Sequence, residues 1–463
     1  MVQDHSRLQQ LIAEYGRLRE LSADEASSRG QRFNHFLAEL LQSWGIKASS
    51  SIRSSGEIDV GFELEGQRFI VEAKWEQKRT DTGQIAKLQK RLRQRLGGTI
   101  GLFISMSGYT QDALNDLKEG EQLAVLCLSR DHVEAMLSGF IPPDELLSEL
   151  VTKASLRGEA YVPLSSLFDV PPVSQLDLSF EAPLQPNELV EASIPGFDAR
   201  VAVSSSRFRP SGVAIAAPNR ILITLTPGIF EVDLEKEEVQ PWLPIPNCSR
   251  NVLITRNGSG YVARRGGVAQ FQTGRLTFVG GGFTGNVSLF EGIDGAPWAF
   301  SNGDPDGSPA VLVRLGERLG NQERFTLDYA PAHGVNAAQI DPDRFLIIGN
   351  AGIVITELYP AATEVITRDL TNPMGLARLS SERFIVTSDC AKPISPTQAK
   401  SMVCLSEINT ASRTVTRLAQ LNLTGSGSEL AAGVGTAAYL YSHFSSQGIV
   451  VQFQTLPVMN RTY

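Results

Sequence analysis

Residues 56–75 have the sequence GEIDVGFELEGQRFIVEAKW, which predicts a β-hairpin. Residues 58–64 and 67–75 each predict a strand, and Glu65-Gly66 between them predicts a tight two-residue turn. Such a turn pairs the two residues that flank it. Counting back along both strands from that pair places Asp59 directly opposite Glu72.

This register would bring together residues suited to metal-assisted phosphodiester hydrolysis. Directly opposed side chains share a face, with Cβ atoms about 4.5–5.5 Å apart, so Asp59 and Glu72 would repel unless a divalent cation lay between them. Lys74 points to the same face, and the main-chain carbonyl of Ala73 could supply another oxygen ligand. A metal activates water and the phosphate, while a lysine stabilises the developing charge. The alternative is an exposed hairpin face on which these residues only add solubility.

Segments on both sides of the hairpin predict an α/β domain. A helix is expected upstream, ending at Gly45, because apolar residues recur at helical spacing. These residues are Phe33, Phe36, Leu37, Leu40, Leu41 and Trp44. The Ser-rich residues 49–56 predict a flexible loop. Downstream we expect a helix over 81–96 and buried strands over 99–105 and 123–128.

Four segments, in the family's order and spacing, resemble the Mrr-like branch of the PD-(D/E)xK nucleases, which are restriction-endonuclease-like DNA-cleaving domains. The segments are residues 30–45, 56–59, 69–75 and 101–110. The resemblance covers about residues 28–140. It implies a helix, a mixed sheet of about five strands and flanking helices. It also implies DNA as the substrate and Mg²⁺ as the cofactor, with Mn²⁺ able to substitute.

By this resemblance, Asp59 and Glu72 are the Mg²⁺ ligands and Lys74 is the catalytic lysine. Members of the Mrr-like branch often carry Gln where Glu72 stands, but Glu is the more general choice of the superfamily. A Glu commonly follows the phenylalanine of the first helix, and here that position is Asn34. An amide oxygen coordinates more weakly than a carboxylate, so the resemblance leaves open whether a second metal binds.

Two other polar residues are accessory candidates. Glu39 lies on the same predicted helix as Asn34 but on a different face, so it is a doubtful substitute for the missing acid. Gln84 stands early in the helix predicted after the hairpin, where the superfamily often places a polar residue near the active site.

The segment from Arg68 to Arg95 is strongly basic, with nine Lys or Arg residues against three acids. The whole chain has a net charge of −8, which excludes a uniformly basic coat for nucleic acid but not a local patch. The residues expected to contact DNA are Lys78, Arg79, Lys87, Lys90 and Arg91. The alternative is an ordinary solvated helix face.

The 463 residues predict several domains. We expect an N-terminal helix over 1–27, the nuclease-like domain over 28–140, a Pro-rich linker over 141–190 and an all-β domain over 191–463. Strand–turn units recur in the last segment at a spacing of roughly 30–55 residues, which predicts a β-propeller of about six blades. A pair of β-sandwiches or another all-β fold is the alternative.

Composition favours a cytoplasmic protein with no membrane partner. No apolar run reaches the roughly 18 residues of a membrane helix, and the charged N-terminus is unlike a secretory signal. Cys390 and Cys404 could meet across a blade hairpin, but a reducing cytoplasm favours free thiols. The glycine-rich residues 280–285 lack the Lys-Ser/Thr of a phosphate loop and predict a turn.

These observations predict a metal-dependent DNA endonuclease, restriction-like and acting in defence against foreign DNA, with a propeller for recognition or regulation. One catalytic centre cuts one strand, so cutting a duplex would favour a homodimer. Two alternatives stay open. The nuclease fold could be catalytically silent in a propeller-based binding protein, or the nuclease could be activated by a small ligand or a protein bound to the propeller.

Overall fold

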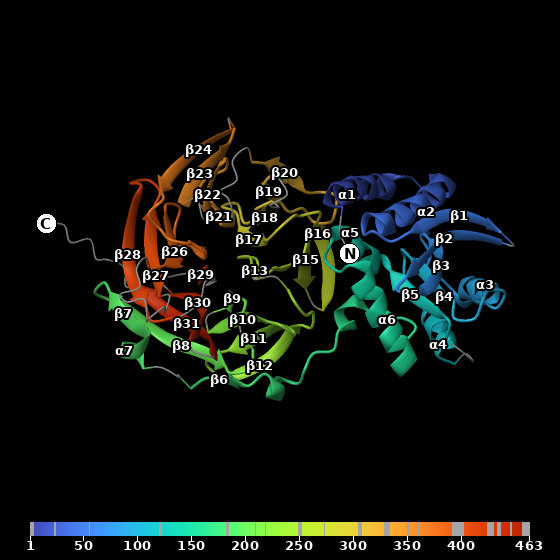
Figure 1. The fold of residues 1–463 in the computed structure, drawn as a ribbon, viewed down its shortest axis with the longest axis horizontal. Coiled ribbons are helices and arrows are strands. Elements are labelled where there is room, and N and C mark those ends of the chain that lie inside the picture. Colours follow the sequence, from blue (N-terminus) through green and yellow to red (C-terminus); the bar gives the residue numbers. More distant parts are fainter. Residues whose placement is uncertain are drawn as a thin grey trace.

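The computed structural model consists of an α/β domain and a ring of β-sheets, which lie side by side in Figure 1. The structure describes residues 4–455, except for 23–24, 55, 120–122, 182–184, 209, 218, 249–251, 273, 304–307, 328–333, 350–351, 360, 391–401, 424–429, 433–436 and 445–446. Among the described residues, no helix is both long and apolar enough to cross a membrane.

The α/β domain is built on one mixed sheet with the strand order β1-β2-β3-β4-β5. Strands β1, β2 and β3 are antiparallel neighbours, whereas β3, β4 and β5 run parallel, as the resemblance implies. The elements are α1 (His5–Glu20), α2 (Ala26–Ser43), β1 (Ala48–Ser54), β2 (Gly56–Leu64), β3 (Gln67–Lys74), α3 (Thr82–Leu92), β4 (Ile100–Ser105), α4 (Gln111–Glu119), β5 (Val125–Ser129), α5 (Arg130–Ser138) and α6 (Pro143–Arg157).

Each face of this sheet packs on a different set of helices. Val71 of β3 belongs to a core that includes apolar residues of α1, α2, α5 and α6. Its neighbour Ile70 points to the other face, into a smaller core with Ile85 and Leu88 of α3 and Ala113 of α4. The alternation along β3 therefore sends consecutive side chains into two separate cores.

The flexible loop predicted over 49–56 is wrong, because most of this segment forms β1, an edge strand paired with β2. Ile52 lies opposite Ile58 and is partly buried against the smaller core. The Ser50 hydroxyl and the His35 ring nitrogen Nδ1 are 2.8 Å apart. Pairing with a neighbouring strand thus outweighs the weak local preference of a serine run.

The all-β part is a six-bladed propeller, which confirms the prediction of about six blades. The first blade contains β9 (Gly212–Ala217), β10 (Arg220–Leu225), β11 (Gly228–Asp233) and β12 (Glu238–Leu243), and the second contains β13 (Val252–Ile254), β14 (Gly260–Arg264), β15 (Gly267–Gln272) and β16 (Arg275–Gly280). The third contains β17 (Val287–Glu291), β18 (Pro297–Ser301), β19 (Val311–Arg314) and β20 (Glu323–Thr326), and the fourth contains β21 (Gly334–Gln339), β22 (Arg344–Gly349), β23 (Gly352–Leu358) and β24 (Ala361–Thr367). The fifth contains β25 (Leu376–Arg378), β26 (Arg383–Asp389), β27 (Val403–Asn409), β28 (Thr414–Leu421) and β7 (Val190–Ser193), and the sixth contains β29 (Leu430–Ala432), β30 (Ala437–Phe444), β31 (Gln447–Thr455), β8 (Phe197–Ser205) and β6 (Leu178–Ser179).

The ring is closed by strands from its two ends. Strand β8 precedes the first blade in the chain, yet it pairs with β31 of the last blade. The first strand of every blade lies innermost, next to the first strands of its neighbours around the axis (Figure 1). Closure of this kind leaves no open seam between the first and last blades.

The segment joining the two parts packs against both of them. After α6 it contains two short 3₁₀ helices, Leu164–Ser166 and Val173–Gln175, and later α7 (Pro186–Leu189). Leu164 belongs to the core of the α/β domain, whereas Leu176 belongs to the core of the first blade. The apolar residues of this Pro-rich segment therefore pack against both parts of the chain.

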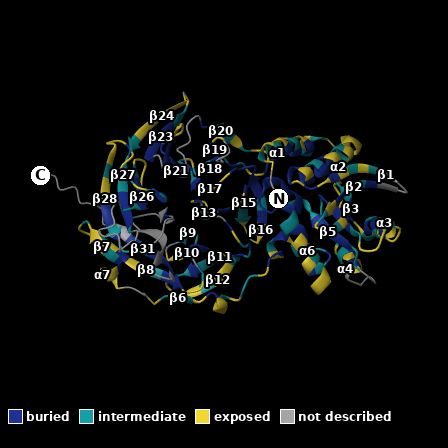
Figure 2. Cartoon of the chain, in the orientation of Figure 1, coloured by how far each residue is buried: buried dark blue, intermediate teal, exposed yellow. Residues whose placement is uncertain are grey.

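The α/β domain is docked on the propeller through a shared core. Buried residues continue from α5 and α6 into the first two blades (Figure 2). Arg264 of β14 is 0% exposed; it donates hydrogen bonds to the carbonyls of Pro246 (2.9 Å) and Phe140 (2.7 Å) and pairs with Glu145. A Cβ on Gly281 would lie 2.6 Å from the Cα of Ser138, so only glycine permits this approach.

Cys390 and Cys404 form a disulfide, with their Cα atoms 5.3 Å apart. The expectation that both would be free thiols is therefore wrong. Cys404 lies within β27 and Cys390 directly follows β26, so strand pairing brings the two together. Cys127 and Cys248 are buried free thiols.

Candidate functional site

The hairpin has the predicted register, with pairs running from Leu64–Gln67 at the turn to Val60–Val71. Both turn residues have positive φ angles, 51° and 78°, as a type I′ turn requires. The next position along the two strands holds Asp59 and Glu72. The turn therefore sets the register that places Asp59 and Glu72 at the same level of the hairpin.

Asp59 is held at the point where the ladder between β2 and β3 ends. Its carboxylate accepts a hydrogen bond of 2.9 Å from the backbone N–H of Ala73. The side chain of Asn34, from α2, also hydrogen-bonds with Asp59. Burial raises the pKa of Asp59, and the charge of Glu72 adds to this, although the Ala73 hydrogen bond opposes them. The charge of Lys74 also opposes the increase in the pKa of Asp59, and a bound cation would act in the same direction.

Glu72 is flanked by two cations and is only 13% exposed. One carboxylate oxygen lies 2.9 Å from the Lys74 Nζ, and the other pairs with the guanidinium of Arg91 from α3. Burial alone would lower the pKa of Lys74, but its hydrogen bond and charge interaction with Glu72 outweigh this and raise the pKa. Lys74 is therefore a cation at neutral pH.

Ser51 is a feature of this region that the sequence did not reveal. It lies opposite Asp59 in β1, between the pairs Ser50–Val60 and Ile52–Ile58, and its φ angle is +53°. A left-handed conformation costs a non-glycine residue about 1–2 kcal/mol. Local distortions of this kind re-aim side chains beside functional sites.

Trp75, directly after Lys74, is held by residues of α1 and α2, of which the sequence analysis named only Phe33. Its ring meets that of Phe33 edge to face at 4.9 Å and lies 5.6 Å from that of Tyr15. Arg29 lies over the ring at 5.8 Å and donates a hydrogen bond to the Trp75 carbonyl at 3.2 Å. Helices α1 and α2 thus fix the end of β3 that carries the lysine.

The two accessory candidates lie in different environments. Glu39 forms an ion pair of 2.8 Å with Arg7 of α1, so it is engaged away from Asp59 and Glu72. Gln84 forms a capping box with Asp81 at the start of α3, and its side-chain amide lies 3.3 Å from Glu76. Both side chains therefore have structural partners.

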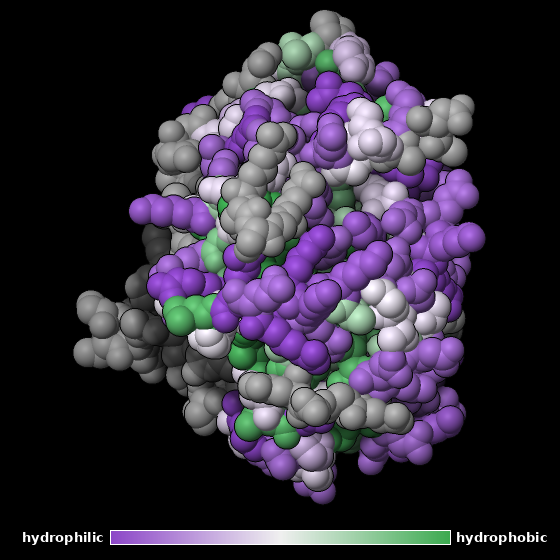
Figure 3. All heavy atoms as spheres, turned by 90° about the vertical axis from the view of Figure 1, so that its right-hand side faces the viewer, coloured by the Kyte–Doolittle hydropathy of each residue, from purple (hydrophilic) through white to green (hydrophobic). Residues whose placement is uncertain are grey.

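The residues predicted to contact DNA fall into two groups. Lys78, Arg79, Lys87 and Lys90 are exposed on α3 and the segment before it. They belong to the end of the molecule shown in Figure 3, which is largely hydrophilic. Arg91 differs from them, because it is partly buried and is turned toward Glu72.

The residues present fit a hard cation such as Mg²⁺. Two carboxylates, the amide of Asn34 and the main chain at Ala73 are oxygen donors, and magnesium is commonly bound by one or two carboxylates. In the described part of the chain, no group of three or more His, Cys, Asp or Glu residues could hold a metal. A site here would therefore rest on two acids.

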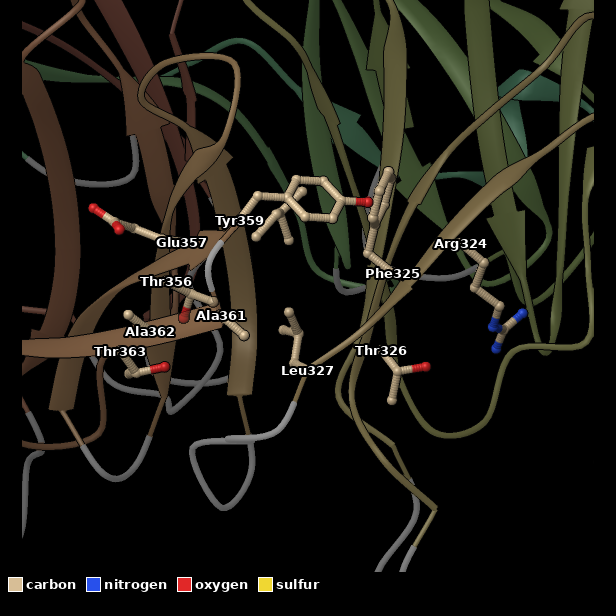
Figure 4. A pocket seen from close by; sticks show the side chains of 11 residues that line it. Arg324, Phe325, Thr326, Leu327, Thr356, Glu357, Tyr359, Ala361, Ala362 and Thr363 are labelled. Carbon is tan, nitrogen blue, oxygen red and sulfur yellow. The ribbon is translucent and has the colours of Figure 1, made fainter.

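A separate cavity of about 390 Å³ lies on the propeller, between the outer strands of the third and fourth blades (Figure 4). It is lined by residues of β20, β23 and β24. The rings of Phe325 and Tyr359 meet edge to face at 6.2 Å beside it. Tyr359 is 68% exposed, which is unusual for a large aromatic residue.

The fold and site define a restriction-endonuclease-like α/β domain carried on a six-bladed propeller. Residues 26–137 match the Mrr_cat family model, described as "Restriction endonuclease", so this part of the chain is similar to the domains of that family. The match includes α2, the hairpin, α3 and nearly all of α5. We found no match to the chain among curated proteins.

Several solved structures resemble the chain over about half of its length. A gluconolactonase from Xanthomonas campestris has 10% identity and a TM-score of 0.43, covering 59% of this chain and 96% of its own. A protein of unknown function from Bacteroides thetaiotaomicron has 11% identity and a TM-score of 0.40, covering 53% and 70%. A putative TolB from Agrobacterium tumefaciens has 10% identity and a TM-score of 0.35, covering 54% and 91%.

Proposed function

We propose that the chain is a metal-dependent endonuclease that hydrolyses phosphodiester bonds in DNA. The observation that carries the proposal is the convergence of Asp59, Glu72 and Lys74 at the end of the hairpin, inside a domain similar to those of the restriction endonuclease family. Two partly buried carboxylates beside a lysine are costly to assemble and have the chemistry for phosphodiester hydrolysis.

Each residue has a distinct task in this proposal. Asp59, Glu72 and the carbonyl of Ala73 would hold Mg²⁺ or Mn²⁺, and Asn34 would offer its amide oxygen. The bound ion would polarise the phosphate and lower the pKa of a water molecule. The Ala73 N–H fixes the carboxylate of Asp59 in place. Lys74 would orient the attacking water or stabilise charge that develops on the phosphate.

The exposed basic residues would bind the DNA backbone. Lys78 and Arg79, in the segment before α3, and Lys87 and Lys90, on α3, are exposed positive charges. Contacts of this kind carry little sequence information but make binding strongly dependent on salt. A single centre cuts one strand, so a homodimer would be the form that cuts a duplex.

The propeller would supply recognition or regulation, and the whole would act in defence against foreign DNA. A second candidate function is a nuclease that a ligand or protein bound to the propeller switches on. It is favoured by the exposed aromatic groove between the third and fourth blades. A third is a silent nuclease fold in a binding protein, for which Asn34 in place of an acid is the argument.

The proposal is tested by cleavage of plasmid and linear DNA with Mg²⁺ or Mn²⁺, comparing the wild type with Asp59→Ala and Lys74→Ala. We expect each substitution to lower the rate by at least about a hundredfold. Glu63→Ala is the matched control, since Glu63 is an exposed acid of the same hairpin whose partner is Arg68, at 3.7 Å.

Cleavage that survives both substitutions would show that this site is not catalytic. If neither modified nor unmodified DNA is cut by the wild type, and it binds no metal, the silent fold becomes the better conclusion. If the wild type binds metal but cuts only after a propeller partner is added, the second candidate replaces the first.

A further inference from the structure

Arg91 is the one predicted DNA contact whose side chain lies in the candidate site. It comes from α3, whereas Glu72 and Lys74 come from β3, so two elements meet at this carboxylate. Leu88 and Leu92 of α3 are buried in the smaller core, and Arg91 lies on the flank between this buried stripe and the solvent. Lys87 and Lys90 point to the exposed side.

The pairing of Arg91 conflicts with metal binding. Glu72 already uses one oxygen for Lys74 and the other for Arg91. A divalent cation bound to either oxygen would lie beside a positive charge, and this repulsion favours withdrawal of one of the two resident cations. Lys74 sits two residues away on the same strand, and its position is fixed through Trp75. The two side chains are about equally exposed, 32% for Lys74 and 33% for Arg91. The catalytic role proposed for Lys74 keeps it beside the metal, so Arg91, which comes from a different element, is the group that would turn outward.

A structural role does not account for the contact. Helix α3 is already anchored by Ile85, Leu88 and Leu92, and its start is fixed by the capping box between Asp81 and Gln84. An ion pair adds little to a helix held in this way. A guanidinium, by contrast, matches a phosphate with two parallel N–H donors, which an ammonium cannot do.

We propose that Arg91 exchanges partners during the reaction, pairing with Glu72 in the metal-free site and contacting the scissile phosphate once metal has taken Glu72. The inference rests on the proposed nuclease function. It makes Arg91 a substrate-contacting residue of the site, unlike Lys87 and Lys90. Metal and substrate binding then become linked, because the metal frees the group that holds the phosphate.

The test measures metal binding and DNA cleavage in the same set of full-length variants. Binding of Mn²⁺ without DNA is followed by titration calorimetry for the wild type, Arg91→Gln, Arg91→Lys, Lys90→Gln and Asp59→Ala. We expect Arg91→Gln to bind Mn²⁺ about tenfold more tightly, because the competing charge is gone. At saturating metal it should nevertheless cut DNA at least about tenfold more slowly.

The controls separate this linkage from general effects of charge and folding. Lys90→Gln removes an equal charge from the exposed side of α3, so its affinity for Mn²⁺ should equal that of the wild type. Arg91→Lys keeps the charge but not the two parallel donors. It should bind metal as the wild type does and still cut slowly. Circular dichroism melts establish that each variant is folded.

The outcomes distinguish the inference from the function on which it rests. If the wild type binds Mn²⁺ and Asp59→Ala does not, the metal site stands. Unchanged or weaker metal binding by Arg91→Gln then overturns the exchange alone, and so does tighter binding with an undiminished rate of cleavage. If Asp59→Ala binds Mn²⁺ as tightly as the wild type, the metal site itself is wrong.

Discussion

The two faces of the α/β sheet are put to opposite uses. One face, with α1, α2, α5 and α6, shares a continuous core with the propeller, whose buried Arg264 donates to the Phe140 carbonyl and pairs with Glu145 of α6. The other face packs on α3 and α4 over a small core and carries the exposed basic residues and Arg91. Both faces bury apolar side chains; we call the first the docked face and the second, whose helix α3 also exposes basic residues, the charged face.

This difference bears on how the propeller could act. Glu72 meets Arg91 of α3 at the end of the hairpin, on the charged face, whereas the propeller contacts α1, α5 and α6. Helix α1 contacts both, because Gln9 donates a hydrogen bond to the Gly282 carbonyl (2.9 Å) and Tyr15 packs near Trp75. Influence from the propeller would therefore pass through α1 and the packed core, and not by covering the site.

The largest loss of stability is expected from removing Arg264, the buried charge between the docked face and the propeller. Arg264→Ala removes the partner of Glu145 and of the carbonyls of Phe140 and Pro246, so we expect the free energy of unfolding to fall by about 3–5 kcal/mol. Urea denaturation measures the loss.

Arg265→Ala is the matched control for this prediction. Arg265 lies 3.4 Å from the same carboxylate but is 55% exposed, so its removal should cost less than about 1 kcal/mol. Equal losses in the two variants would mean that the docked face does not depend on its buried ion pair. A loss at Arg264 with unchanged DNA cleavage by the folded fraction would show that docking and catalysis are independent.

A smaller effect should appear with pH, again on the docked face. His132 of α5 is fully buried; the Ser129 N–H donates to its Nδ1 (3.0 Å), and its Nε2 contacts the Val162 carbonyl of the connecting segment (3.0 Å). Burial lowers the pKa of His132 to about 4, whereas the unfolded chain has a value near 6.5. The unfolded state therefore binds the proton first, and stability is lost as the pH falls from about 6.5 to about 4.

The total loss from this group should be about 3 kcal/mol, complete below the folded pKa. His132→Gln does not titrate in this range, so its unfolding free energy should depend less on pH. Urea denaturation at several pH values from 7.5 to 4.5 measures both slopes. Parallel curves for the wild type and the variant would refute the assignment of this loss to His132.

The charged face shows what a sequence can predict about a site. The pairing of Asp59 with Glu72 followed from local chemistry, because a two-residue turn of Glu and Gly sets the register over a few residues. The propeller could be predicted for a similar reason, because strand–turn units of local sequence repeat along the chain. Three of these units start with apolar strands at Arg220, Arg344 and Arg383, which are β10, β22 and β26 in the structure.

What the sequence did not reveal depends on contacts between distant segments. Strand β1 forms from a serine run only because β2 offers it a partner. Closure of the ring by β8 and the use of Gly281 for docking involve residues far apart in the chain. The partner of Arg91 could not be predicted for the same reason. The helical pattern shows that Arg91 lies beside the buried side of α3, but it does not show that Glu72 of β3 is there to pair with it.

The smallest effect is expected at the groove between the third and fourth blades, which neither face of the sheet contacts. Tyr359→Ser should change the unfolding free energy by about 0.5 kcal/mol or less, because the side chain is largely exposed. Phe345→Ala, in the buried core of the same blade, is the contrasting control and should cost about 3–5 kcal/mol.

Cleavage assays on Tyr359→Ser then distinguish a groove that binds a partner from a propeller that acts on the nuclease through the packed core. If the groove receives an activating partner, the variant should cut DNA as the wild type does when alone, but should fail to respond to that partner. If the purified variant is as stable as the wild type and cuts more slowly without any partner, the propeller influences the nuclease directly, through the packed core that joins them. A large loss of stability would instead make Tyr359 part of the structure of its blade and remove the groove as a binding surface.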